Sequence, residues 1–245
     1  MKHYHGTPIG GSRQDAARFL MGRHALVPFT YQADTGIVSD VCQSFVFDNG
    51  AFTAWKQGGE LDVAGYTAWV RDWCKHPGFE WALIPDVIEG DEADNDAHIE
   101  AWRDAGLALY GVPVWHLHES LERLAALCDQ WPTVAFGSSG QWATLGTQGW
   151  WNRMSEAMDV ICDEHGRPAA KLHGLRMLDP AIFTHLPLAS ADSTNAAVNC
   201  GSVKRFGMYT PPTSAQRAAV IAERIEAHNS APVWVRGGTQ VALAL

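Results

Sequence analysis

Eight short apolar runs, most of them ending in a glycine or a chemically active residue and each followed by a helix-like stretch, dominate this sequence. They are Lys2–His5, His24–Phe29, Phe45–Asp48, Trp81–Asp86, Val112–His118, Thr133–Gly137, Lys171–Arg176 and Leu186–Asp192. Strands that alternate with helices form a parallel sheet covered by helices, and eight such units can close into a (β/α)8 barrel. We therefore predict an α/β protein with a TIM-type barrel. An open, doubly wound sheet is the alternative.

Helical periodicity is clearest in five segments, 62–75, 94–106, 119–131, 150–165 and 214–228. In the first of these, Tyr66, Trp69 and Trp73 mark one apolar face. The length of 245 residues fits one barrel of ordinary size. Because no linker or low-complexity tract interrupts the chain, residues 1–245 are expected to form a single domain.

Composition favours a cytoplasmic protein. No apolar stretch approaches the roughly 20 residues that cross a bilayer, and the first residues lack the apolar centre of a signal peptide. The five cysteines are odd in number and show no metal-ligand spacing, which argues against a disulfide framework and a structural zinc. We therefore expect no membrane partner, no metal and no cofactor, while a homodimer is compatible with these features.

The net charge of −9 counts against nucleic acid as a partner, because non-specific binding depends on cation–phosphate attraction. It does not exclude nucleic acid, since a local basic strip can coexist with a negative total. Two modest basic clusters, Lys171/Arg176 and Lys204/Arg205, come near predicted strand ends. A solvated surface is their ordinary explanation, and a phosphate-binding role is the alternative.

Carboxylates follow three of the predicted strands. Asp48 precedes a glycine, so the backbone can turn sharply and hold the carboxylate over the mouth of a barrel. Asp86 follows a proline and lies too far before the next helix to cap it, and Asp192 is flanked by hydroxyl residues that could orient it. Each has a plain alternative, as a turn or cap residue.

Histidines and small residues mark other strand ends. His116 and His118 fall on one side of a strand, one inside the barrel and the other nearer its lip. Such a pair can bind a metal, and His3/His5 is a second pair, which gives a metal-dependent hydrolase with Asp192 as a further ligand as an alternative function. Hydrogen bonding within the barrel or to a substrate needs no metal. The loop of Gly137, Ser138 and Ser139 offers backbone amides to a flat ligand or an anion.

The order of these segments resembles the tRNA-guanine transglycosylase superfamily. Asp48-Asn49-Gly50-Ala51-Phe52 is similar to its Asp-Ser-Gly-Gly-Phe motif, Val114 to Glu119 to its Val-Gln-Gly strand end, and Phe136-Gly137-Ser138 to its Gly-Gly loop. Leu172-His173-Gly174-Leu175, followed by Ala191-Asp192-Ser193, resembles its glycine-containing strand and the strand that ends in the nucleophile. The nearest branch is the one of bacteria and phages that inserts 7-deazaguanine bases into DNA. The resemblance spans roughly residues 45–200, and its weight lies in the order of the motifs.

The resemblance implies a base-exchanging glycosyltransferase. Asp192 would attack the anomeric carbon and form a covalent glycosyl intermediate, and Asp48 would protonate and deprotonate the exchanged bases. Asp86, His118 and the backbone of Gly137 and Ser138 would read the edge of a purine or deazapurine. Phe52 or Trp142 would stack on the base, and the substrate-binding set is completed by Ser139, His173, Arg176 and Ser193. The partners would be a free modified base and a nucleic acid, with DNA favoured over tRNA.

This chain departs from the superfamily in two respects. Members that act on tRNA carry three cysteines and a histidine as a zinc site after the nucleophile, whereas this chain has only Cys200 there. The zinc subdomain is therefore expected to be missing. His118 and Ser138 stand in place of a glutamine and a glycine, so the accepted base is expected to differ. A non-catalytic barrel that binds a nucleobase is the third function that fits the sequence.

Overall fold

Parallel strands form one closed ring in this computed structural model, which describes residues 1–237. The strands are β1 (Lys2–Gly6), β2 (His24–Pro28), β3 (Ser44–Asp48), β4 (Phe79–Leu83), β5 (Gly111–Val112), β6 (Val114–His116), β7 (Thr133–Gly137), β8 (Lys171–Gly174) and β9 (Ser190–Ser193). They hydrogen-bond in the order β5-β4-β3-β2-β1-β9-β8-β7-β6. All eight predicted runs contain strand residues at the expected places.

The ring closes at Pro113, which separates β5 from β6. Proline has no N–H to donate, so the ladder is interrupted there and one strand becomes two short halves. On one side Ile84 N–H donates to Val112 O (2.9 Å), and on the other Ala135 N–H donates to Pro113 O (2.9 Å). The two halves therefore complete an eight-stranded barrel, and the predicted TIM-type fold is confirmed against the open sheet.

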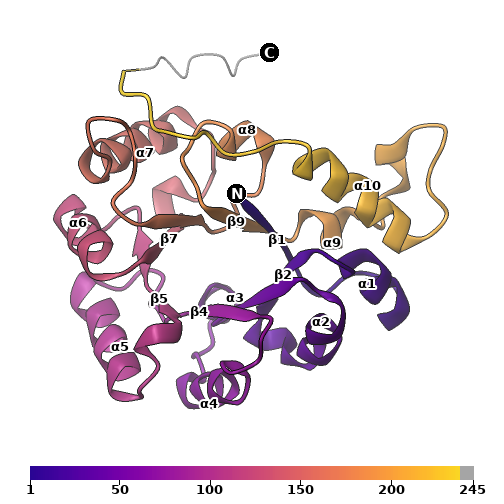
Figure 1. The fold of residues 1–245 in the computed structure, drawn as a ribbon, viewed down its shortest axis with the longest axis horizontal. Coiled ribbons are helices and arrows are strands. Elements are labelled where there is room, and N and C mark those ends of the chain that lie inside the picture. Colours follow the sequence, from indigo (N-terminus) through magenta and orange to yellow (C-terminus); the bar gives the residue numbers. More distant parts are fainter. Residues whose placement is uncertain (238–245) are drawn as a thin grey trace.

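Helices surround the ring of strands (Figure 1). They are α1 (Arg13–Leu20), α2 (Thr35–Val41), α3 (Ala51–Gln57), α4 (Val63–Trp73), α5 (Glu92–Asp104), α6 (Leu121–Gln130), α7 (Gln148–Ile161), α8 (Pro180–Phe183), α9 (Asn195–Asn199) and α10 (Ser214–Glu226). The five segments with clear periodicity correspond to α4, α5, α6, α7 and α10. Capping supports these ends: α5 begins at a capping box in which Asp91 and Asp94 each accept the other's backbone N–H.

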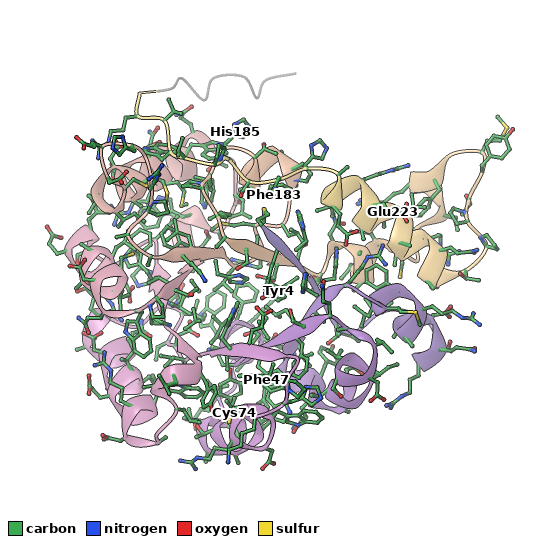
Figure 2. All side chains as sticks on the ribbon, in the orientation of Figure 1. Tyr4, Phe47, Cys74, Phe183, His185 and Glu223 are labelled. Carbon is green, nitrogen blue, oxygen red and sulfur yellow. The ribbon has the colours of Figure 1, made fainter. Side chains whose placement is uncertain are left out.

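The main core lies between the strands and the helices. Phe47 on β3 stacks on Trp69 of α4, with ring centroids 3.7 Å apart, and sits among the packed side chains outside the ring (Figure 2). Inside the ring, Tyr4, Leu26 and Val46 pack together against Trp81. This apolar plug fills the middle of the barrel, so the carboxyl ends of the strands are where a ligand can enter.

The described residues form one barrel domain. Residues 238–245, which the single-domain prediction included, lie outside them. No helix within residues 1–237 is both long and apolar enough to span a membrane. All five cysteines are free thiols.

Candidate active site

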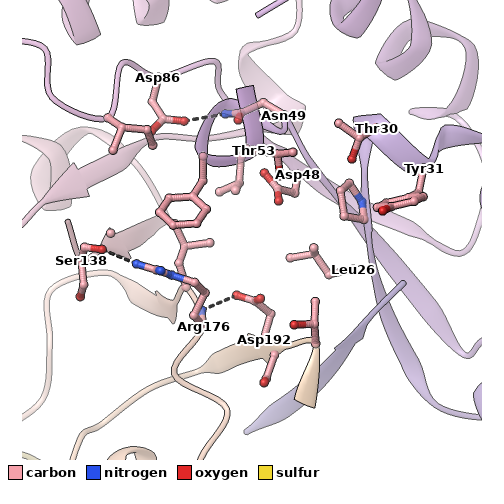
Figure 3. Close-up of a pocket in the computed structure, with 18 of the residues that line it drawn as sticks. Leu26, Thr30, Tyr31, Asp48, Asn49, Thr53, Asp86, Ser138, Arg176 and Asp192 are labelled. Carbon is pink, nitrogen blue, oxygen red and sulfur yellow. Dashed lines mark hydrogen bonds between the residues drawn. The ribbon is translucent and has the colours of Figure 1, made fainter. Parts of the chain in front are cut away.

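A cavity of about 430 Å³ lies over the carboxyl ends of the strands, with Leu26 in its lining (Figure 3). Most of the predicted site residues line it: Asp48, Phe52, Asp86, Gly137, Ser138, Ser139, Arg176, Asp192 and Ser193. They come from five different strand ends, those of β3, β4, β7, β8 and β9, which is how this fold assembles a site from distant sequence positions. The structure therefore brings the three predicted carboxylates to one hollow. His118, Trp142 and His173 are not part of its lining.

Asp48 ends β3 and turns its carboxylate into the cavity. The turn depends on Gly50, whose φ of +81° is in the left-handed region that favours glycine. Gly50 N–H donates to Asp48 Oδ1 (3.0 Å). Burial raises the pKa of Asp48 to about 7, helped by the charges of Asp192 and Asp86 and opposed by the Gly50 N–H and by Arg176. Asp48 can therefore give and take a proton near neutral pH.

Asp192 on β9 is only 6% exposed and is held by one of its two oxygens. The backbone N–H of Arg176 donates to Oδ1 (2.9 Å), and Nε2 of His173 lies 3.3 Å from the same atom. The hydroxyl of the flanking Ser193 accepts the N–H of Asn195 (3.0 Å) and forms no hydrogen bond with Asp192 in the described residues, so Ser193 takes the alternative role of a turn residue. Backbone and ring nitrogens from the neighbouring strand segment thus hold this carboxylate.

Arg176 crosses the cavity between Asp192 and Phe52. It is the one non-glycine residue with positive φ (+62°) in the described chain, and this turn aims its N–H at Asp192. Its guanidinium lies 4.4 Å from the centre of the Phe52 ring and donates to Ser138 O. Burial lowers the pKa of Arg176, while Asp192 and Asp48 oppose the shift. Lys171 lies at the other end of β8, so the two residues do not form one basic cluster in the structure.

Asp86 lies in a hydrogen-bonded chain with Asn49 and His116. Asn49 Nδ2 donates to Asp86 Oδ1 (2.7 Å) and to Ile84 O (2.8 Å). Nε2 of His116 lies 2.8 Å from Asp86 Oδ2, so Nε2 carries a proton, because an ionised carboxylate only accepts. Both oxygens of Asp86 are thus engaged by protein groups, which fixes its carboxylate at the cavity wall.

His116 lines the cavity where His118 was predicted to do so. The strand ends at His116, so the alternation of sides does not reach His118, which is exposed in the following turn. Its ring stacks on His116 at 5.6 Å, and its Nε2 lies 3.1 Å from Gly90 O. The sequence did carry a signal that His116 belongs to the site. It follows Val112 and Val114 at intervals of two residues, which places its side chain inside the barrel.

Two further predicted site residues lie elsewhere. Trp142 lies in a 3-10 turn (Gly140–Trp142), and the centre of its ring is 5.9 Å from the guanidinium of Arg153. His173 is completely buried in the barrel interior beside Asp192. Ser138 and Ser139 do line the cavity, but Ser138 Oγ accepts the indole N–H of Trp150 (3.0 Å), which leaves its carbonyl for Arg176.

The histidines of the hydrolase alternative do not form one site. Nε2 of His3 lies 3.1 Å from His228 O, and Nε2 of His5 lies 2.8 Å from Glu226 Oε1, both on the α10 side of β1. His116 lies inside the barrel. Among residues 1–237 no three His, Cys, Asp or Glu side chains are grouped closely enough to hold a metal ion. The structure therefore does not bring the histidine pairs and Asp192 together as the ligands of one metal ion in residues 1–237.

Comparison with known proteins identifies the fold. No family model and no curated protein matches this chain. Mutant tryptophan synthase alpha-subunits from the hyperthermophile Pyrococcus furiosus have similar structures. One is 11% identical with a TM-score of 0.52, covering 93% of this chain and 98% of that one. Another is 12% identical with a TM-score of 0.53, covering 92% and 97%. Sequence identity this low supports only a shared fold. The comparisons therefore show that the chain is a TIM-like barrel.

Proposed function

We propose that this protein is a base-exchanging glycosyltransferase, as the resemblance to tRNA-guanine transglycosylases implies. The observation that carries the proposal is that Asp48 and Asp192 face one cavity in opposed environments. Burial raises the pKa of Asp48 to about 7, whereas Asp192 accepts the backbone N–H of Arg176 (2.9 Å) and has the Nε2 atom of His173 3.3 Å away. When two carboxyl groups in one site have different environments, one can serve as the acid–base group and the other as the nucleophile.

The reaction proceeds through a covalent intermediate. An oxygen of Asp192 attacks C1′ of the nucleotide, the C1′–N bond breaks, and its electron pair leaves with the base. Protonated Asp48 gives its proton to the departing base. The incoming base then loses a proton to Asp48 and attacks C1′, and the C1′–O bond breaks to return the Asp192 carboxylate. Protons balance over the two halves, so the exchange requires no cofactor.

The cavity suits a planar base. Its volume lies within the range of small-molecule sites. Phe52 and the guanidinium of Arg176 supply flat surfaces for stacking, and Asp86, His116 and the Ser138 carbonyl supply polar edges. We propose a purine or deazapurine as the base and DNA as the preferred polymer.

The direct test is exchange of a labelled base. Radiolabelled guanine and 7-deazaguanine derivatives are incubated with DNA and RNA, and incorporation into the polymer is counted. Asp192→Ala is expected to abolish incorporation, because the attacking oxygen is lost. Asp48→Asn is expected to reduce it by about 100-fold or more, the usual contribution of a positioned acid–base group. Asp72→Ala, on the exposed side of α4, is the control and should exchange normally.

Two results would contradict the proposal. Exchange that continues in Asp192→Ala excludes this residue as the nucleophile. Binding of free bases that is unaffected by Asp48→Asn and Asp192→Asn, with no incorporation by the unaltered protein, would instead support the non-catalytic binding barrel.

A further inference from the structure

His173 lies directly beside Asp192 but outside the cavity. It is on β8, with Ser190 of β9 as its register partner, and its side chain is fully buried. Its ring packs edge-on against Trp81 and Tyr4, with centroids 4.8 and 5.9 Å away. His173 therefore cannot contact a base in the cavity. Any effect that it has on the site must act through the hydrogen-bonding contacts of its two ring nitrogens.

The contacts of the two nitrogens select one tautomer. Nδ1 lies 2.9 Å from Ser190 Oγ, which can donate or accept. Nε2 lies 3.3 Å from Asp192 Oδ1 without forming a full hydrogen bond, and it has no hydrogen-bond partner among residues 1–237. A lone pair facing a carboxylate oxygen would be repelled. Nε2 therefore carries the proton, and Nδ1 accepts from the Ser190 hydroxyl.

The two oxygens of Asp192 are consequently not equivalent. Oδ1 accepts the Arg176 N–H (2.9 Å) and faces the His173 N–H. No hydrogen bond from the described part of the chain reaches Oδ2. We propose that His173 is a positioning residue which, together with the Arg176 N–H, holds Oδ1 and leaves Oδ2 as the oxygen that attacks C1′. This inference deepens the proposed function and rests on it for the role of Asp192.

The asymmetry has different effects on the two half-reactions. In the covalent intermediate Oδ2 is bonded to C1′ and Oδ1 is the ester carbonyl oxygen. When the incoming base attacks, the C1′–Oδ2 bond breaks, its electron pair stays on Oδ2, and the restored charge is shared with Oδ1. The N–H groups beside Oδ1 stabilise that charge. Loss of the His173 N–H should therefore slow breakdown of the intermediate more than its formation.

The tautomer can be measured without any substrate. Long-range ¹H–¹⁵N correlation spectra of the ¹⁵N-labelled full chain distinguish protonated from bare ring nitrogens, and His173→Gln identifies the His173 signals by their loss. The inference predicts a protonated Nε2 and a bare Nδ1. A proton on Nδ1 alone would overturn it, whatever the protein's activity proves to be.

The second arm compares matched variants in the exchange assay. His24 flanks the same Tyr4 ring, is half-buried and lies 2.7 Å from Ser44 Oγ through Nδ1, so His24→Phe is the control for replacing a histidine that packs on Tyr4. End-labelled DNA with guanine as the incoming base reports the trapped covalent adduct. His173→Phe is expected to raise the adduct fraction and to slow exchange about tenfold. This effect is smaller than that of removing a well-aligned hydrogen-bond donor. His173→Gln, which retains an N–H of similar reach, should restore part of the rate.

The outcomes separate the two proposals. An adduct fraction that is unchanged in His173→Phe, or equally changed in His24→Phe, contradicts the positioning role. If His173→Phe does not fold, His173→Gln and the spectra decide. Complete absence of adduct and exchange in the unaltered protein counts against the proposed function, while the tautomer still tests the asymmetry of Asp192.

Discussion

Two aspartates in this barrel differ through their neighbours and not through their own chemistry. Asp48 is enclosed at the end of β3 with one backbone N–H on its carboxylate, and burial outweighs that bond in its effect on the pKa. Asp192 meets a backbone N–H and an imidazole nitrogen at Oδ1. Such differences depend on contacts across strands, so the sequence could indicate two carboxylates but not their division of labour.

The raised pKa of Asp48 predicts how stability changes with pH. The folded protein keeps a proton on Asp48 that the unfolded chain releases. The contribution of Asp48 to the free energy of unfolding therefore falls as the pH rises from about 4 to 7 and then levels off. At about 1.4 kcal/mol per pKa unit the loss is at most about 4 kcal/mol. Asp48→Asn should remove this slope and be more stable than the unaltered protein above pH 7. Urea unfolding at several pH values measures it, and an unchanged slope would contradict the assignment.

The left-handed backbone of Arg176 predicts different effects of two small substitutions. Arg176→Gly and Arg176→Ala both remove the guanidinium, but only alanine retains a Cβ that disfavours φ of +62°. The glycine variant should therefore be more stable by about 1 kcal/mol. Thermal unfolding of the pair measures this difference. Equal stability would mean that the turn at Arg176 is not strained.

At the scale of elements, β6 and β7 approach closely at the cavity wall. A Cβ on Gly137 would lie 2.8 Å from His116 Nδ1 and 3.1 Å from Val114 Cγ1. We expect Gly137→Ala to destabilise the fold by about 1–3 kcal/mol through overpacking. Gly149→Ala on α7, where nothing lies within 4 Å, should instead stabilise it by up to about 1 kcal/mol. Chemical unfolding compares them, and equal effects would contradict the close contact.

The sequence predicted elements where their pattern is local. Strands such as β7 were recognisable because an apolar run ends in glycine, and α6 because its apolar stripe follows the Ser120 cap. Short helices such as α8 and α9, of 4 and 5 residues, carry too few turns to show periodicity. The end of β6 at His116 depends on its pairing with β7, so His118 was placed wrongly in the site.

At the scale of the molecule, a basic segment follows the cavity in sequence. Val198 on α9 lines the cavity, and the 3-10 turn that follows (Val203–Phe206) carries the exposed pair Lys204 and Arg205. Arg217 anchors both ends of this segment by donating to the carbonyls of Cys200 and Pro211. In a chain of net charge −9, these cations are candidates for contact with the phosphates of a polymer substrate.

Charge removal tests this polymer contact. The double variant Lys204→Ala/Arg205→Ala should weaken binding of a fluorescent DNA oligonucleotide and reduce the slope of log affinity against log salt by about 2. Lys75→Glu, in the loop before β4, lowers the net charge by the same amount and should change affinity much less. Fluorescence anisotropy across a salt series measures both, and equal losses would indicate a general charge effect.

The measurement that bears most directly on the account is the chemical location of the covalent intermediate. The protein is incubated with DNA in the absence of an incoming base, denatured and digested with protease and nuclease, and its peptides are sequenced by mass spectrometry. We predict a sugar-phosphate remnant on Asp192, and none in Asp192→Ala. A remnant on another residue, or an adduct that persists in the alanine variant, would contradict the assignment of Asp192 as the nucleophile.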